Sequence, residues 1–340
     1  MTIMPKHFII FQNGGVGDFL MALFLAGELR RNGALRVYIV LHRGAGFLQQ
    51  FAESYPYVTV IEASLRRPRG LFEVARLFLK RNAVILPPTI GRFPLRVKLL
   101  ARMLAGFGPL VGFQDNGALC GIYTKTLPYK LDQDFAESMR DVIRALGMKA
   151  ASEPPRLLID SDEGSLVRSG LSGKRYVVFH PRGSSERRRL SEAECVAIIE
   201  CILQIAPELH VAVSGAESER AHVEGIMQRA NNPRAVAVIG ASPKGLAALI
   251  RGGELFVGMD TGITHLACFL DAKVLLIGKN ATANWLPYYH PRAVVLYRLA
   301  EEDVVRKDRH YLLSRQQGRI RPFKDVPVAE VCAEVRAMLA

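Results

Sequence analysis

The 340-residue chain has no run of apolar residues that approaches the length of about 18 needed to cross a membrane. Its apolar segment near the start, His7–Gln12, is also too short for the core of a signal peptide. Only five cysteines are present, scattered and never spaced as Cys-x-x-Cys, which argues against a structural zinc site and a disulfide framework. The eight histidines form no His-x-x-x-His or His-Glu-x-x-His pattern, so we expect no metal site. These absences favour a protein of the reducing cytoplasm.

The composition is that of a folded globular protein, with 49% hydrophobic and 23% charged residues. A chain of 340 residues suits two domains of roughly 150 residues each better than one core. The net charge of +13 points toward acidic partners, namely nucleotide phosphates, phosphorylated lipid, an anionic membrane surface or nucleic acid. The sign of the charge alone does not choose among them.

Short apolar segments alternate with helical patterns in the N-terminal half, which indicates a parallel sheet flanked by helices. We predict strands at His7–Gln12, Arg36–Leu41, Val58–Glu62 and Ala83–Leu86, and helices at Phe19–Arg31, Gly46–Glu53, Leu71–Lys80, Leu95–Ala105 and Gln133–Leu146. The helix at Leu95–Ala105 is basic and amphipathic. A Pro-rich stretch at 151–155 then breaks the helical pattern, and we place a linker there.

A second alternating series follows the linker and predicts a second domain of the same kind. We predict strands at Tyr176–His180, His210–Ser214, Ala235–Ile239, Leu255–Gly258 and Lys273–Gly278, and helices at Ser191–Gln204, Glu219–Ala230, Lys244–Gly252 and His265–Phe269. The expected domains are 1–155 and 156–322, and the segment 323–340 carries an amphipathic helix, Val326–Leu339, that docks back on the first domain. Two such domains normally hold a ligand at the carboxyl ends of their strands, in the cleft between them.

The segment Gly258–Ala267 runs from the end of an apolar strand through a small polar turn into a helix. Its two glycines permit a tight turn, and Thr261 or Thr264 can cap the helix, which we expect to begin near His265. Backbone N–H groups and the positive end of the helix then face one point, where a phosphate or diphosphate can bind. Taken alone, the pattern is more often an ordinary capped turn.

The segment Asn13–Asp18 lies directly between the first strand and the first helix. At a helix N-terminus the dipole favours the ionised form of Asp18, and the glycines before it allow a substrate to approach the backbone. An N-cap aspartate without catalytic duty fits the motif equally well. A dinucleotide fingerprint is incomplete because Leu20 occupies the third glycine position, and the second strand ends at His42-Arg43 rather than an acid. An NADP-dependent oxidoreductase therefore stays open only as an alternative.

Basic and hydroxyl side chains follow the strand that ends at His180. Arginine pairs bidentately with phosphate oxygens, and Ser184 or Ser185 can add neutral donors, although a solvated basic surface is the alternative. After the next strand, Glu217 or Glu219 could hold a ribose diol by hydrogen bonds, or could cap the following helix. Trp285, the only tryptophan, could line a base or sugar pocket or fasten a loop.

The order of these motifs resembles glycosyltransferase family 9, the ADP-heptose:lipopolysaccharide heptosyltransferases of GT-B fold. The segment Leu246–Ala267 is similar to the family's helix, strand and Asp-[Ser/Thr]-Gly-x-x-His-Leu-Ala motif. Gly17-Asp18 is similar to its N-terminal Gly-Asp helix start, and His180–Ser191 to its donor-phosphate segment. The likeness covers nearly the whole chain and is strongest over residues 176–290. It implies an α/β protein of GT-B fold, with two Rossmann-like domains facing across a cleft.

Three positions depart from the family's pattern. Gly14–Gly17 stands where a single glycine is usual, Leu190-Ser191 where the family has Trp-Pro, and Ile277–Asn280 where it has Phe-Gly-Pro-Thr. The last change falls in the expected nucleotide pocket and leaves the identity of the donor open.

Carried over residue by residue, the resemblance implies that Asp18 is the general base. Arg188, or its neighbour Arg187, stands where the family uses a lysine to neutralise the departing phosphate, and Glu219 or Glu217 stands near its ribose-binding acid. The predicted donor site comprises Ser184, Ser185, Glu217, Glu219, Asp260, Thr261, Gly262, Thr264 and His265, and the predicted acceptor site comprises Asn13, Gly15, Arg92 and Arg96.

The resemblance therefore implies an inverting glycosyltransferase that moves a heptose from ADP-heptose onto a saccharide or glycolipid acceptor of the lipopolysaccharide-core type. We expect no metal and no cofactor besides the nucleotide-sugar donor, and no nucleic-acid partner. Arg92, Arg96, Lys98 and Arg102 could meet a phosphorylated acceptor during peripheral contact with the cytoplasmic face of the inner membrane, or form a solvated helix face. A catalytically silent sugar-nucleotide or polyanion binder on the same fold is the second alternative.

Overall fold

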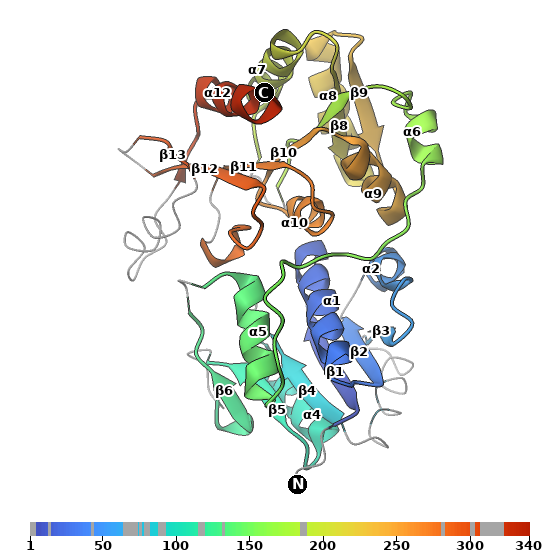
Figure 1. Ribbon diagram of the computed structural model, residues 1–340, viewed down its shortest axis with the longest axis vertical. Coiled ribbons are helices and arrows are strands. Elements are labelled where there is room, and N and C mark those ends of the chain that lie inside the picture. Colours follow the sequence, from blue (N-terminus) through green and yellow to red (C-terminus); the bar gives the residue numbers. More distant parts are fainter. Residues whose placement is uncertain are drawn as a thin grey trace. The chain divides into compact units, whose positions relative to one another are not determined.

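The structure is a computed structural model in which the chain divides into two compact units, Met1–Ile159 and Asp160–Ala340 (Figure 1). It describes residues 5–12, 15–41, 44–63, 74, 77, 82–87, 93–114, 120–130, 133–183, 189–279, 283–299, 303–306 and 323–340. Most of the predicted helix Leu71–Lys80 lies outside these residues.

The first unit is built on a six-stranded parallel sheet with the strand order β3-β2-β1-β4-β5-β6. Its strands are β1 His7–Gln12, β2 Arg36–Leu41, β3 Val58–Glu62, β4 Asn82–Leu86, β5 Leu110–Phe113 and β6 Lys125–Leu127. The chain leaves β1 toward β2 and later returns on the other side of β1 through β4. The carboxyl end of β1 is therefore a topological switch point, where open α/β sheets bind their ligands.

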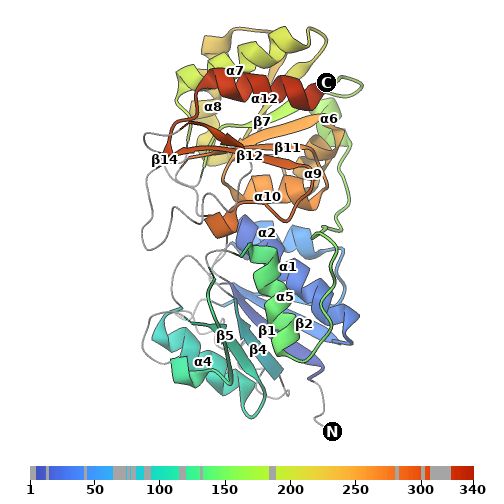
Figure 2. The same cartoon turned by 60° about the vertical axis from the view of Figure 1, so that its left-hand side comes forward.

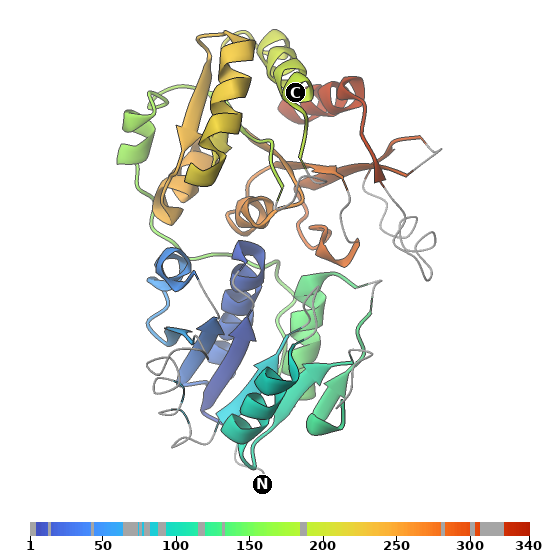
Figure 3. The ribbon, with the colours of Figure 1, turned by 180° about the vertical axis from the view of Figure 1, so that it is seen from behind.

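Helices cover both faces of this sheet. The helices α1 (Val16–Arg31) and α5 (Phe135–Ala145) pack against each other on the face that is in front in Figure 1. The helix α4 (Leu95–Ala105) lies on the opposite face, which is in front in Figure 3. The buried Ala101 and Leu104 of α4 pack there with Ile9 and Phe11 of β1. The unit also contains α2 (Ala45–Ala52) and the 3-10 turn η2 (Cys120–Ile122).

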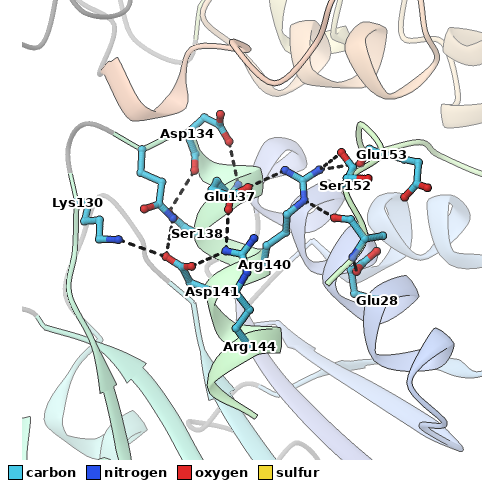
Figure 4. Close-up of polar contacts among 12 residues, drawn as sticks. Glu28, Lys130, Asp134, Glu137, Ser138, Arg140, Asp141, Arg144, Ser152 and Glu153 are labelled. Carbon is cyan, nitrogen blue, oxygen red and sulfur yellow. Dashed lines mark hydrogen bonds and ion pairs between the residues drawn. The ribbon is translucent and has the colours of Figure 1, made fainter. Parts of the chain in front are cut away.

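The stretch after α5, where the sequence predicts a linker, is held against α1 and α5 by buried charges (Figure 4). The guanidinium of Arg140 donates to the carbonyls of Ala151 at 2.8 Å and Glu153 at 2.7 Å. Glu28, fully buried on α1, accepts the N–H of Ala151 at 2.8 Å. Buried charges need such partners because an unpaired charge in a protein interior costs several kcal/mol. These bonds make this stretch part of the first unit.

The second unit is built on an eight-stranded sheet with the order β13-β12-β11-β10-β7-β8-β9, and β14 pairs with β12. Its strands are β7 Tyr176–His180, β8 His210–Gly215, β9 Ala235–Ile239, β10 Leu255–Met259, β11 Val274–Gly278, β12 Ala293–Leu299, β13 Val305–Arg306 and β14 Phe323–Lys324. The strands β7 to β12 run parallel, whereas β13 and β14 pair antiparallel with β12. Here the strand order reverses between β7 and β10, which is the second switch point.

Helices again flank the sheet. They are α6 Gly164–Arg168, α7 Glu192–Ile205, α8 Arg220–Ala230, α9 Pro243–Gly252, α10 Gly262–Phe269 and α12 Val328–Leu339, with 3-10 turns η4 Glu217–Glu219 and η5 Ala283–Trp285. Alternate residues of β7, β8, β10, β11 and β12, such as Val257 and Met259 of β10, join α7, α8 and α12 in one core cluster. The intervening residues face the other side of the sheet, because side chains alternate along a strand.

The C-terminal helix is part of the second unit: α12 packs against α7 (Figure 2), where its buried Val331 and Val335 join the core of that unit. The structure also joins Cys201 of α7 to Cys332 of α12 by a disulfide, which the cysteine spacing argued against. The apolar face of α12 packs in the core of the second unit, and this packing brings Cys201 and Cys332, which are distant in the sequence, together.

Most predicted elements agree with the structure to within a few residues, and the helix Leu95–Ala105 agrees at both ends. The sequence analysis missed β5, β6, α6 and the three last strands, all of which are short except β12. Within the described part of the chain, no helix is long and apolar enough to span a membrane.

Candidate functional site

Four of the predicted polar segments begin at one edge of the second sheet. The strands β8, β7, β10 and β11 are consecutive neighbours and run parallel, so their carboxyl ends lie side by side. The register pairs Gly258 of β10 with His180 of β7, the two strands at the switch point. The turn after Met259 therefore starts beside the segment after His180.

The turn between β10 and α10 is capped by Thr261. Its Oγ1 accepts the N–H groups of Ile263 at 3.2 Å and Thr264 at 3.4 Å. The helix consequently begins at Gly262 rather than near His265. The hydroxyl of the buried Thr264 donates to the carbonyl of Met259 and ties the turn to the strand.

Because of this cap, the start of α10 has fewer free N–H donors for an anion than an uncapped helix would have. The Thr261 side chain already occupies two of the first N–H groups of α10. Among the described residues, none accepts from the N–H of Gly262, and the Thr261 hydroxyl keeps its own proton to donate. Asp260, at the end of β10, is only 4% exposed. The turn can therefore offer an anion one backbone N–H, one hydroxyl and the positive end of the helix.

The two glutamates after β8 differ in their partners. Glu219 has a side chain 17% exposed, accepts the N–H of Ala216 at 2.9 Å and lies 3.4 Å from the guanidinium of Arg182. Glu217 has a side chain 67% exposed and forms a bidentate pair with Arg220 at 2.7 and 2.9 Å. Arg220 lowers the pKa of Glu217 through this pair. Glu219, paired with a residue that follows β7, is thus the carboxylate that faces the switch point.

A buried histidine lies between these strand ends. The Nδ1 of His180 is 3.0 Å from the hydroxyl oxygen of Ser214, at the end of β8. Burial lowers the pKa of His180, and the nearby Glu219 opposes this shift. The imidazole is therefore neutral near pH 7, and its contact with Ser214 ties the ends of β7 and β8 together.

His265, predicted to bind the donor, lies in an aromatic cluster. Its Nδ1 is 2.8 Å from the hydroxyl of Tyr289, its ring stacks on Tyr289, and Trp285 packs edge-on at 5.9 Å between centroids. Burial lowers the pKa of His265 to about 4. A neutral, buried imidazole can line a pocket and form one hydrogen bond, but it supplies no positive charge.

In the first unit, Asp18 lies in the first turn of α1, directly after the switch point of that sheet. The N-cap is Gly15, and the side chain of Asp18 makes no capping hydrogen bond. A Cβ on Gly15 would lie 2.9 Å from Oδ2 of Asp18, so the glycine gives the carboxylate its space. The alternative of an N-cap aspartate does not hold in this structure.

Asp18 is half-buried, and no described residue forms a hydrogen bond or ion pair with it. Burial raises the pKa of Asp18 from 3.8 to about 6. A carboxylate with this pKa is mostly ionised near pH 7, yet is a better proton acceptor than an ordinary aspartate. An unpaired carboxylate of raised pKa at a switch point is a candidate functional group.

Several predicted site residues lie outside the described residues. They are Asn13, Arg92, Ser184, Ser185, Arg187 and Arg188. Arg96 is exposed in the first turn of α4. Across the described ranges, no group of three or more His, Cys, Asp or Glu side chains is placed to hold a metal ion.

Three residues of this edge were absent from the predicted site. Arg182 was one of several arginines in its segment, and its contact with Glu219 singles it out. Ser214 and Tyr289 gain their significance only from the histidines that they contact. No local pattern marks Tyr289, because it lies 24 positions after His265 in the chain.

Each unit is a doubly wound α/β layer structure with polar side chains at its switch point, which defines a protein of two Rossmann-like domains. The sequence model of glycosyltransferase family 9 (heptosyltransferase) matches residues 95–311, more than half of the chain. The chain belongs to glycosyltransferase family 9. No curated protein sequence matches it closely enough to count as a relative.

Solved structures share the fold at low sequence identity. The glycosyltransferase family 9 protein of Veillonella parvula is 16% identical, with a TM-score of 0.73 over 100% of this chain and 98% of that one. The ADP-heptose lps heptosyltransferase II of E. coli is 15% identical, with a TM-score of 0.73 over 98% of both chains. The E. coli heptosyltransferase WaaC with ADP is 17% identical, with a TM-score of 0.64 over 85% and 92%. The fold is therefore GT-B, as predicted, and the protein is a glycosyltransferase.

Proposed function

We propose that this glycosyltransferase is inverting and transfers a heptose from ADP-heptose to a saccharide acceptor of the lipopolysaccharide-core type. The observation that carries the proposal is Asp18, a half-buried carboxylate without a described partner, whose pKa is raised to about 6. An inverting transfer needs one base of this kind to take the proton of the attacking hydroxyl. The choice of donor is supported by the E. coli heptosyltransferases, named for ADP-heptose or determined with ADP, which share the fold.

In the proposed reaction, Asp18 accepts the proton of an acceptor hydroxyl as its oxygen attacks the anomeric carbon. The new bond joins that oxygen to the carbon, on the face opposite the nucleotide. The bond between the carbon and the diphosphate oxygen breaks, and its electron pair leaves with the diphosphate. The N–H of Gly262, the Thr261 hydroxyl and the α10 dipole, together with Arg188, would stabilise this growing charge. The proton leaves Asp18 for solvent after release of the product.

Two further roles complete the proposal. Glu219 would hold the ribose diol, because it is less exposed than Glu217 and faces the switch point through Arg182. Gly15, the N-cap of α1, and Asn13, which precedes it by two positions in the sequence, would border the acceptor beside Asp18. Arg92 and Arg96 would contact acidic groups of the acceptor.

Calorimetric titration with ADP and with NADPH tests the class of donor. We expect saturable binding of ADP, because the Asp260 turn offers N–H and hydroxyl donors to a diphosphate, and no binding of NADPH, because the glycine fingerprint is incomplete. The variant Glu219→Gln should weaken ADP binding more than the matched Glu217→Gln, whose parent carboxylate is held by Arg220. Saturable NADPH binding without any response to ADP, GDP or UDP would instead favour the oxidoreductase.

Transfer itself distinguishes the enzyme from a silent binder. Incubation with ADP-heptose and a heptose-deficient lipopolysaccharide core should release ADP and add one sugar, read by mass spectrometry. The product should carry the anomeric configuration opposite to that of the donor. ADP binding without transfer to any such acceptor would leave a sugar-nucleotide binder on the same fold.

A further inference from the structure

The helix α4 carries an exposed apolar face that the proposed reaction does not use. Leu95, Leu99 and Met103 are 53%, 47% and 63% exposed, and Phe107, just after the helix, is fully exposed. The other large hydrophobic side chains exposed in the described part of the chain are Leu35, Phe47, Leu158 and Val167, spread over separate elements. A contiguous exposed apolar patch on a soluble domain generally marks an interaction surface.

The geometry of the helix explains this clustering. Residues four apart lie on one side of an α-helix, since each residue turns about 100°, so Leu95, Leu99 and Met103 form one stripe. The opposite side, with Ala101 and Leu104, is buried against the sheet. The inward side alone is needed to hold α4 in the fold. The outward stripe is therefore free to contact something else.

Arginines border the stripe on both sides. By the same turn angle, Arg96 lies beyond Met103 on one flank and Arg102 lies beside Leu95 on the other. No acidic residue occurs between Pro94 and Phe107, and Lys98 is turned inward, its ammonium over the ring of Tyr123. A helix with an apolar face flanked by cations is the pattern of a segment that lies in the plane of a bilayer containing anionic lipids.

We propose that α4 is a membrane-contact helix that inserts Leu95, Leu99, Met103 and Phe107 into the headgroup region of an anionic bilayer. The charge argues against a second copy of the chain, because two such faces would bring like charges together on a protein of net charge +13. A bilayer with acidic headgroups offers both an apolar interior and negative charge at its surface. This inference is independent of the sugar that is transferred.

Co-sedimentation with lipid vesicles tests the proposal on the full chain. The parent protein should bind vesicles of phosphatidylcholine with phosphatidylglycerol, bind pure phosphatidylcholine vesicles far more weakly, and be released by high salt. Leu99→Ser with Met103→Ser should lower the apparent affinity by about tenfold or more. Arg96→Gln with Arg102→Gln should lower it by about tenfold on anionic vesicles only.

The matched control is Leu158→Ser with Val167→Ser, two side chains that are 62% and 66% exposed away from α4. This pair should bind vesicles as the parent does, and circular dichroism should show the same melting temperature for all variants. Equal vesicle binding by the Leu99/Met103 variant and the parent would overturn the proposal. An equal loss of vesicle affinity in the Leu99/Met103 variant and the Leu158/Val167 control would also overturn it. A concentration-dependent dimer that only the α4 variant abolishes, without vesicle binding by the parent, would assign the face to a second copy instead.

Discussion

Substitution of Asp18 by asparagine should lower the rate of sugar transfer by about 100-fold or more, the scale typical of losing a positioned proton acceptor. The change is nearly isosteric and removes only the charge and the basicity. It costs no cap, because Gly15 is the N-cap of α1 and Asp18 makes no capping bond. The affinity for ADP should barely change, because the proposed diphosphate donors are on α10. Steady-state transfer and calorimetric titration of the same preparation measure the two effects.

The pH dependence of transfer gives a second readout of the same group. Because burial raises the pKa of Asp18 to about 6, the fraction of the parent enzyme with an ionised base falls as the pH drops through about 6. The kcat/KM of the parent, which reports ionisations of the free enzyme, should decline with it, whereas the residual kcat/KM of Asp18→Asn should lack that step. A parent profile that is flat from neutral pH down to the ordinary aspartate range would contradict the assignment of Asp18 as the base.

The same substitution should increase stability. The folded-state pKa of Asp18, about 6, lies above its value of 3.8 in an unfolded chain, so the folded state binds the proton more tightly. The free energy of unfolding of the parent therefore falls as Asp18 ionises between pH 3.8 and about 6. Asparagine does not ionise, so the variant avoids this decrease. Near neutral pH the free energy of unfolding of Asp18→Asn should exceed that of the parent by on the order of 1 to 3 kcal/mol.

Urea unfolding at several pH values measures this gap, which should widen from pH 3.8 to about 6 and then stay constant. The matched control is Asp134→Asn, the same chemical change at an aspartate whose carboxylate caps α5 by accepting the N–H of Glu137 at 2.9 Å. That variant should gain no stability and keep its transfer activity. If Asp18→Asn transferred sugar at the parent rate, Asp18 would have only a structural role.

Nine of the described strands could be predicted from the sequence because buried parallel strands are nearly uninterrupted apolar runs, although the buried strand β12 was missed. The strand Arg36–Leu41 and the helix Leu95–Ala105 agree with the structure at both ends. The strand β6, with only Lys125–Leu127, is a short edge strand with no buried side chain, so it leaves no hydrophobic pattern to read. The four residues of β5 include Gly112, whose missing side chain accommodates the ring of Tyr123. Only the neighbouring strand gives these segments their structure.

The predicted site was limited in the same way. Motifs located the strand ends, because glycine, hydroxyl and charged residues interrupt apolar runs there. The sequence named Glu219 before Glu217, two positions earlier, and the structure adds that Glu219 meets Arg182 whereas Glu217 pairs with Arg220. The disulfide of Cys201 and Cys332 spans 131 residues and depends on how α12 packs against α7, which no spacing rule reports. The sequence indicates chemistry at strand ends, and tertiary contacts decide which side chain performs it.

Replacement of Arg188 by alanine should raise the barrier to transfer by about 2 to 4 kcal/mol, if this side chain meets the leaving phosphate. Arg188 lies outside the described residues, so its role rests on the sequence and on the likeness to the family's lysine. The described neighbours support the choice of a residue in this stretch. Arg182 is already paired with Glu219, which leaves a later arginine to supply the charge.

The variants around Arg188 separate a positioned cation from a generic basic surface. Arg188→Lys should keep most of the activity, because a lysine retains the charge at the position where the family carries one. Arg187→Ala is the matched control, an adjacent arginine whose loss should cost less than that of Arg188. Because charge grows on the diphosphate only as the bond breaks, Arg188→Ala should lower kcat more than it weakens ADP binding. Normal turnover in both alanine variants would instead show that the arginines after His180 form only a basic surface. The Asp260 turn would then be the principal group that stabilises the leaving diphosphate.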